Sequence, residues 1–166
     1  MSNFPTKILL ATDGSEEAEL AALRAVDMAQ STDSELHMVH VGVVPTFLAS
    51  YPGALGYNRK LYEQIEEEAR KLLRELSWQV KAAGGTVAET HLRMGEVDLE
   101  IVALAKEVGA GLIVMGCRGH RGIRRAIEGS ISDGVIRHAP CPVLVVRSHE
   151  SAKTPEQPAI LQGGGR

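Results

Sequence analysis

Four short segments of the chain are apolar almost from end to end, and longer amphipathic stretches separate them. The segments are KILLAT (7–12), ELHMVHV (35–41), GLIVMG (111–116) and PVLVVR (142–147). Continuous apolar runs of this length are typical of strands that are covered on both faces, as in a parallel sheet. Together with the stretches between the runs, this feature favours the α/β class.

The stretches between the runs repeat apolar residues at helical spacing. The segment 15–31 opens with Ser15 as a candidate N-cap, and the segment 60–85 ends at two glycines. A weaker strand at 86–95 and a helix at 97–108 complete the order β-α-β-α-β-α-β-α-β. This order predicts one parallel, doubly wound, Rossmann-like sheet, whose ligands lie at the carboxyl ends of the strands.

Two segments lack a regular pattern. Residues 42–58 are rich in Gly and Pro and are predicted to form a loop. Residues 149–166, which end in ILQGGGR, are predicted to form a disordered tail. We therefore expect a single domain at 1–148 followed by a tail at 149–166.

Composition excludes several classes of protein. No apolar run approaches the ~20 residues that a membrane span needs, and the N-terminus does not have the pattern of a secretion signal. A net charge of −3 argues against general nucleic-acid binding. Two cysteines, Cys117 and Cys141, fit a reducing compartment and are interpreted as small buried residues rather than redox sensors. We expect a cytoplasmic protein.

Glycines follow the third apolar run, GLIVMG, in GCRGHRGIRRAIEGS (116–130). Glycine lets the backbone approach a ligand closely, and the N–H groups at a helix start attract anions. A tight turn and a helix cap would explain the same glycines equally well. The Walker phosphate loop is excluded because no lysine precedes Ser130, and the dinucleotide fingerprint is excluded because ATDGSEEA follows the first strand.

The glycines and the serine fit the spacing G-x2-G-x9-G-[ST] at Gly116, Gly119, Gly129 and Ser130. With KILLATDGS before it and GSISDGVIRHAPCPVLVV at its end, the chain resembles the ATP-binding class of the universal stress protein family over residues 5–147. The resemblance implies a five-stranded parallel sheet with helices on both faces. It also implies an adenine nucleotide, ATP, lying across the strand ends.

The resemblance assigns the nucleotide contacts residue by residue. Adenine would meet the backbone of Val41, and the ribose and the phosphates would lie beside the ends of the first and fourth strands and the start of the last helix. The implied nucleotide-binding residues are Thr12, Asp13, Val41, Met115, Gly116, Arg118, Gly119, Gly129, Ser130, Ile131 and Ser132.

Two further readings concern metal ions. Asp13 lies at the carboxyl end of a strand and is a candidate ligand for a nucleotide-bound Mg²⁺, although Asx turns are also common in TDGS. His37 and His40 are three residues apart on one strand and so point to opposite faces. One ion could not easily bind both, and no metal is predicted there.

The leading functional hypothesis is an ATP-binding regulatory or stress-response protein. We expect a homodimer paired along the last strand through Val143 and Val145, because that strand lies at a sheet edge in the resembling fold. ATP hydrolysis is expected to be slow or absent, since His120 and Glu128 are weak candidates for orienting a water. The alternatives are a dimeric scaffold with an empty site and a weak ATPase or nucleotidyl-transfer enzyme.

Overall fold

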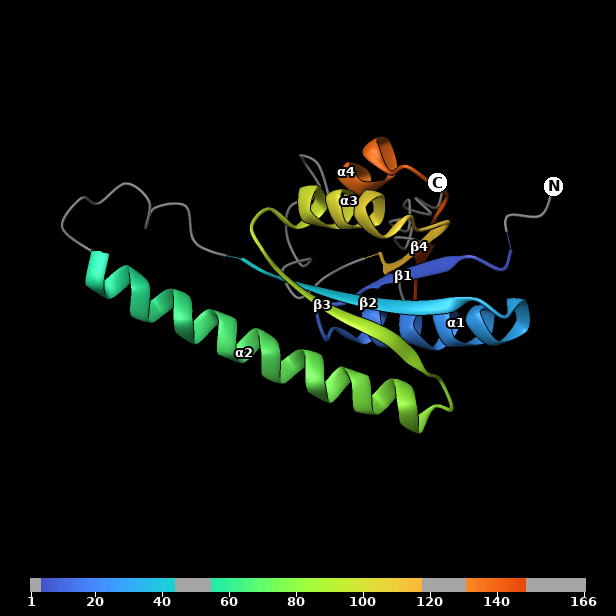
Figure 1. Cartoon of the computed structure of the whole chain (residues 1–166), viewed down its shortest axis with the longest axis horizontal. Coiled ribbons are helices and arrows are strands. Elements are labelled where there is room, and N and C mark those ends of the chain that lie inside the picture. Colours follow the sequence, from blue (N-terminus) through green and yellow to red (C-terminus); the bar gives the residue numbers. More distant parts are fainter. Residues whose placement is uncertain (1–3, 44–54, 118–130, 149–166) are drawn as a thin grey trace, which may run out of the picture.

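Five parallel strands form the centre of the molecule, in a computed structural model that describes residues 4–43, 55–117 and 131–148. Their order is β3-β2-β1-β4-β5, with β1 at Lys7–Ala11, β2 at Glu35–Gly42, β3 at Val87–Met94, β4 at Leu112–Gly116 and β5 at Val143–Val146. Figure 1 shows α1 (Glu16–Thr32) and α2 (Leu55–Ala82) on one side of the sheet, and α3 (Val97–Val108) and α4 (Ile131–His138) on the other. The predicted α/β class and the five-stranded doubly wound sheet are confirmed.

The helix α1 begins and ends as its sequence predicts. The hydroxyl of Ser15 accepts a hydrogen bond of 3.3 Å from the amide of Ala18, so Ser15 is the N-cap. At the other end Asp33 takes a left-handed conformation (φ 53°) and donates its own N–H to the carbonyl of Ala29. Both ends of the helix therefore have hydrogen-bond partners for terminal backbone groups.

The segment 42–58 is not irregular throughout, which corrects the loop prediction at both of its ends. Gly42 is the last residue of β2, and α2 already begins at Leu55. Extending an established helix costs far less than nucleating one, so the strongly amphipathic sequence after Lys60 can carry the helix into a Gly-containing start. Residues 44–54 lie outside the described part of the chain.

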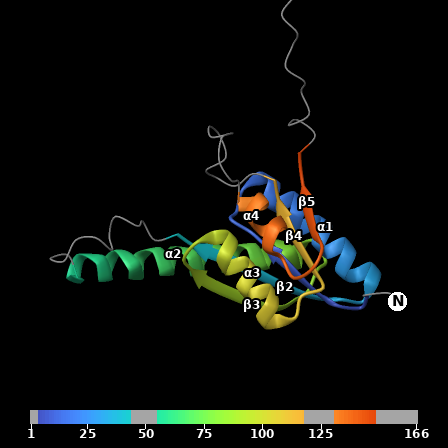
Figure 2. The same ribbon diagram turned by 90° about the horizontal axis from the view of Figure 1, so that it is seen from above.

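The long helix α2 extends past the sheet at its N-terminal end (Figures 1 and 2). Its buried stripe faces the sheet through Ala69, Leu73, Leu76 and Val80, while i,i+4 ion pairs such as Arg59–Glu63 lie on its exposed side. The described part of the chain contains no helix that is both long and apolar enough to cross a bilayer.

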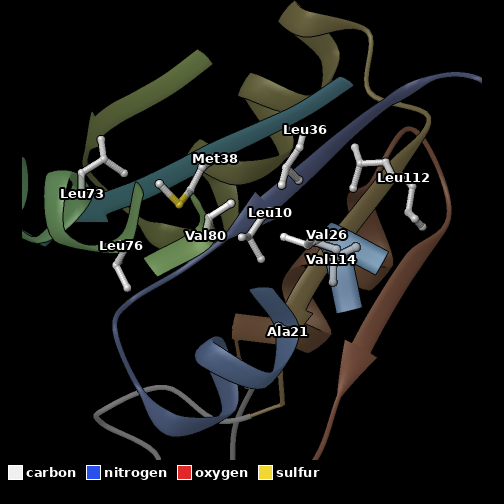
Figure 3. Packing of buried hydrophobic residues seen from close by; sticks show 12 residues of the cluster. Leu10, Ala21, Val26, Leu36, Met38, Leu73, Leu76, Val80, Leu112 and Val114 are labelled. Atoms are coloured by element: carbon white, nitrogen blue, oxygen red, sulfur yellow. The ribbon is translucent and has the colours of Figure 1, made fainter. Parts of the chain in front are cut away.

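Two hydrophobic clusters lie on the two faces of the sheet. One joins the central strands to α1 and α2 through residues such as Leu10, Met38, Val26 and Leu76 (Figure 3). The other joins alternate residues of the same strands to α3 and α4, with Leu9, Val39, Ile113, Leu104 and Val135 among its members. Because both faces are covered, β1 is apolar along nearly its whole length.

The pairing of β2 with β3 contains an irregularity that decides which side chains share a face. Leu36 pairs with Val87, but the next residue, His37, pairs with Glu89. One extra residue in β3 reverses its alternation, as in a β-bulge. Val87 and Leu92 consequently pack against the same α1–α2 cluster although they are five residues apart.

Candidate functional site

The carboxyl ends of β1 and β4 flank the point where the winding of the sheet changes direction. From β1 the chain passes through α1 to β2 on one side, whereas β4 lies on the other side of β1. The register pairs Ala11 with Met115, which makes Thr12 and Gly116 neighbours across the two strand ends. Open α/β sheets bind ligands at such a switch point.

The end of β1 is an ordered turn that leads into α1. Thr12 is buried, its amide donates to the carbonyl of Val39 over 3.0 Å, and its own carbonyl lies 2.8 Å from Nδ1 of His40. Asp13 accepts a hydrogen bond of 3.0 Å from the amide of Ser15, which is an Asx turn. The turn therefore holds the carboxylate of Asp13 at the carboxyl edge of the sheet.

The end of β4 lies very close to the first turn of α1. A Cβ atom on Gly116 would lie 2.9 Å from the carbonyl carbon of Glu17 and 3.0 Å from the amide nitrogen of Ala18. Any other residue would force two backbones apart here. The next residue, Cys117, donates its amide to the carbonyl of Val146 over 2.8 Å and so keeps β4 aligned with β5. Gly116 thus has a packing role that is independent of any ligand.

The end of β2 extends beyond its neighbour β1. The last register pair between them is Ala11 with Val39, so Val41 lies past the end of β1. Main-chain N–H and C=O groups two residues apart on a strand point to the same side, and Val41 therefore directs its own toward the space beyond Thr12. Its side chain is buried in the α3–α4 cluster. This arrangement offers a main-chain donor and acceptor at the same edge of the sheet.

The helices α1, α3 and α4 follow β1, β3 and β4 at this edge, and their first turns differ in charge. The first turn of α1 carries Glu16, Glu17 and Glu19, that of α3 carries Asp98 and Glu100, and that of α4 carries Asp133 alone. In that turn of α4, Ile131 is half exposed and Ser132 is buried. Because carboxylates repel an anion, the start of α4 is the most favourable of the three for a phosphate group.

The structure brings together part of the predicted site. Thr12, Asp13, Val41, Met115 and Gly116 lie at the carboxyl edge, and Ile131 and Ser132 start the helix that leads from that edge back to β5. Four predicted contacts lie outside the described residues, namely Arg118, Gly119, Gly129 and Ser130. His120 and Glu128 also lie outside them.

One group of chemically active side chains was missed from the sequence. His37 faces the α3 side of the sheet, and its Nδ1 lies 3.2 Å from Nε2 of His91 on β3, with Glu89 beside them. Burial lowers the pKa of His91 below its usual value, against the smaller opposing effect of Glu89. His40 has a different partner, the carbonyl of Thr12. These side chains come from two strands that are far apart in the sequence, so no short motif contains all of them.

Both cysteines are free and half-buried. Cys141 packs against the α3–α4 cluster just before β5, and burial raises the pKa of its thiol above the ordinary value. A raised pKa disfavours the reactive thiolate. This environment supports the interpretation of Cys141 as a packing residue.

The chain matches known proteins over most of its length. The model of the universal stress protein family matches residues 5–147. A putative universal stress protein of Staphylococcus haemolyticus is 39% identical over 144 residues, which cover 86% of this chain and 85% of the relative. The match ends where the predicted tail begins, and the domain boundary at residue 148 stays a prediction.

Solved structures share the fold. A universal stress protein of Lactobacillus plantarum superposes with a TM-score of 0.74 at 27% identity, covering 88% of this chain and all of that one. A universal stress protein in complex with cAMP has a TM-score of 0.66 at 25% identity, covering 87% and 98% of the two chains. One from Archaeoglobus fulgidus in complex with dAMP has a TM-score of 0.60 at 25% identity, covering 85% and 97%.

Proposed function

The chain belongs to the universal stress protein family, and on that premise we propose that it binds ATP at the carboxyl edge of its sheet. The protein would act in the cytoplasm, where its two free cysteines stay reduced, as a nucleotide-responsive regulatory or stress-response protein. It would hold ATP and hydrolyse it slowly or not at all.

The observation that carries this proposal is the switch point of the sheet, where the ends of β1 and β4 lie side by side. Thr12 and Gly116 bring two backbones side by side there, and both belong to the set that the sequence predicts for the nucleotide. Two solved relatives hold adenine nucleotides, cAMP in one case and dAMP in the other. An adenine nucleotide is therefore the ligand class that fold position and relatives jointly favour.

The charges and main-chain groups at the edge suggest how ATP would be oriented. The main chain of Val41 lies beyond the end of β1 and would read the edge of the adenine base by hydrogen bonds. The triphosphate would extend toward α4, whose first turn is less acidic than those of α1 and α3, and toward Arg118, Gly119 and Gly129. Asp13 is the residue that would hold an accompanying Mg²⁺, because carboxylate oxygen is a preferred magnesium ligand.

Slow hydrolysis follows from what phosphoryl transfer requires. A fast reaction needs a positioned water molecule in addition to neutralised phosphate charge. The turn at Asp13 engages its carboxylate with the amide of Ser15, and the other candidates for orienting water are His120 and Glu128. We expect turnover far below the ~1 s⁻¹ that marks the lower end of ordinary enzymes.

The test combines retained ligand with measured affinity. Mass spectrometry of gently purified protein should find ATP, and calorimetry on nucleotide-free protein should show binding of ATP in preference to GTP. Replacing Gly129 by valine should abolish ATP binding, because a β-carbon would intrude where phosphate approaches the helix start. The control is Gly122→Val, which alters the same segment outside the motif.

The binding and hydrolysis measurements also distinguish the proposed function from its alternatives. Unchanged ATP affinity in a folded Gly129→Val variant would refute the site assignment. Absence of any adenine-nucleotide binding would favour a scaffold with an empty site. Magnesium-dependent phosphate release at enzyme-like rates, lost in His120→Ala or Glu128→Gln, would favour the ATPase.

The edge strand β5 is the proposed contact between two copies of the chain. It is a short, entirely apolar strand, VLVV, with β4 as its neighbour in the sheet. Its outer backbone groups can pair with the same strand of a second copy, which would form a homodimer through Val143 and Val145.

A further inference from the structure

Three potential metal ligands gather on the α3 side of the sheet, away from the carboxyl edge. His37 is the third residue of β2, Glu89 is its register partner on β3, and His91 follows two residues later on the same face. Among the described residues, their ligand atoms all lie within 4.8 Å of one another. The extra residue in β3 is what brings them to one face, since regular pairing from Leu36 and Val87 would have turned Glu89 and His91 to the α2 side.

The spacing of the donor atoms fits a small divalent cation. In a tetrahedral site with metal–ligand bonds of about 2.0–2.1 Å, two donor atoms lie about 3.3 Å apart. Nδ1 of His37 and Nε2 of His91 are 3.2 Å apart, and Oε2 of Glu89 lies 3.9 Å from each of these nitrogens. The side chain of Glu89 is 64% exposed, so it can move the remaining half ångström without disturbing the core.

A second carboxylate is placed to fix the tautomer of His37. Oε2 of Glu35 lies 3.4 Å from Nε2 of His37, the ring nitrogen that faces away from His91. A proton on Nε2, donated to Glu35, leaves the lone pair of Nδ1 directed toward His91 and Glu89. Histidine ligands of metals commonly donate their other N–H to a carboxylate in this way.

Burial makes one side of the cluster rigid and leaves the other open. The side chain of His37 is only 5% exposed and that of His91 13%, whereas the two glutamates are more than half exposed. Two fixed imidazoles with a mobile carboxylate provide three protein ligands and leave a fourth position for water. Imidazole and carboxylate donors together suit zinc and its neighbours in the first transition series.

We propose that His37, His91 and Glu89 bind one zinc-class divalent transition-metal ion, which links β2 to the edge strand β3, with Glu35 as a positioning residue. The inference does not depend on nucleotide binding, because the cluster lies toward the amino end of β2 whereas the proposed nucleotide site is at the carboxyl ends. The ion would tie the outermost strand to the sheet at the place where its pairing is irregular.

The test uses the full-length chain, freed of metal by a chelator and kept free of nucleotide. Titration with Zn²⁺ against a chromophoric chelator should give one ion per chain, and Co²⁺ in place of Zn²⁺ should give the visible absorption of a four-coordinate site. Zn²⁺ should also raise the Tm of the wild-type protein, since a ligand that binds only the folded state stabilises it.

Substitutions at the proposed ligands and at a histidine outside the cluster should affect Zn²⁺ affinity differently. We expect His91→Ala to abolish Zn²⁺ binding and Glu89→Gln to weaken it by at least tenfold, and Glu35→Gln to weaken it about tenfold, as outer-shell changes typically do. The control is His138→Ala. His138 lies on α4, away from the cluster, and its Nδ1 is 2.9 Å from the carbonyl oxygen of Gly134. That variant should keep the wild-type affinity.

The proposal is overturned if the wild-type chain binds no Zn²⁺, or if a folded His91→Ala or Glu89→Gln variant keeps the wild-type affinity. Circular dichroism establishes which variants fold. If His91→Ala does not fold, Glu89→Gln decides alone, because its exposed side chain can be replaced without opening the core.

Discussion

The two halves of the sheet, on either side of β1, are built differently. Strands β2 and β3 have eight residues each and an outer strand with charged and imidazole side chains, whereas β4 and β5 have five and four residues and an outer strand of Val and Leu only. The β3 edge ends in an ion pair between Arg93 and Glu107 of α3. Charges on an edge strand discourage pairing with other chains, and their absence from β5 permits it.

The contrast also separates the two proposed sites. The nucleotide motif begins at Gly116, the last residue of β4, while the His–Glu cluster bridges β2 and β3. The proposed phosphate contacts and the proposed contact with a second copy would then lie in the β4–β5 half, while the β2–β3 half would bind a cation and supply Val41 to the adenine base. The two proposed sites do not overlap, because one lies at the carboxyl ends of the strands and the other toward the amino end of β2.

The largest expected effect is loss of the proposed dimer when a charge is placed on β5. Val145→Asp should give a monomer in light scattering at micromolar concentration, because an unpaired carboxylate would have to be buried at the strand contact. The matched change Thr90→Asp, at an exposed position of the β3 edge, should leave the dimer intact.

Val145 also packs against the α3–α4 cluster, so folding of that variant needs a separate check by circular dichroism. Hydrogen exchange on the wild-type chain supplies a measurement without any mutation. The amides of β5 should exchange faster on dilution as the dimer dissociates. A persistent dimer in a folded Val145→Asp variant would place the interface elsewhere, with α2 as the next surface to test.

A smaller effect should distinguish two glycines, one in each half. Gly116→Ala would push a Cβ atom into the backbone of α1 and should cost about 1–3 kcal/mol in free energy of unfolding. In Gly42→Ala the Cβ atom would come within 2.5 Å of the sulfur of Met94, which sits near the end of a flexible side chain and can move aside. Urea unfolding of both variants should show the larger loss for Gly116; equal losses would contradict the reasoning.

The smallest effect concerns the ion pair at the β3 edge. The side chain of Glu107 is 54% exposed, and exposed pairs contribute roughly 0.2–1 kcal/mol. Glu107→Gln should therefore lower the free energy of unfolding by less than about 1 kcal/mol, and the difference from wild type should shrink in high salt. A loss above about 2 kcal/mol would show that Arg93 depends on this partner more than a surface pair does.

The fold could be predicted because its signals are local. Each buried strand is a continuous apolar run, and the cap at Ser15 and the glycines after α2 mark helix ends within a few residues. The N-terminal end of α2 could not be predicted, since Gly and Pro nearby indicated a loop while propagation from the rest of the helix started it at Leu55. The residues at the ends of β1 and β4 were expected in one site because of the family resemblance, and the register of these two strands makes Thr12 and Gly116 neighbours.

The His–Glu cluster could not be predicted from local sequence patterns. Correct alternation along β2 separated His37 from His40, but it could not show that His91, fifty-four residues after His37, lies beside it. That requires the register between two strands, and here the register changes by one residue after Leu36. A single added residue reverses every side chain that follows, and nothing in the sequence of β3 alone marks it.

The central position of β1 has a consequence for folding while the chain is being synthesised. Ile8 pairs with Leu36 on one side but with Leu112 on the other, so one edge of β1 stays bare until β4 has been made. Adding the residues from the end of β3 to the end of β4 takes about 1–4 s at a translation rate of ~5–20 residues per second. During that time the nascent chain exposes an incomplete sheet, and the unpaired apolar edge of β1 can pair with another nascent chain. Yield in the cell would then depend on the pace of translation and on chaperone supply as well as on the free energy of the finished fold.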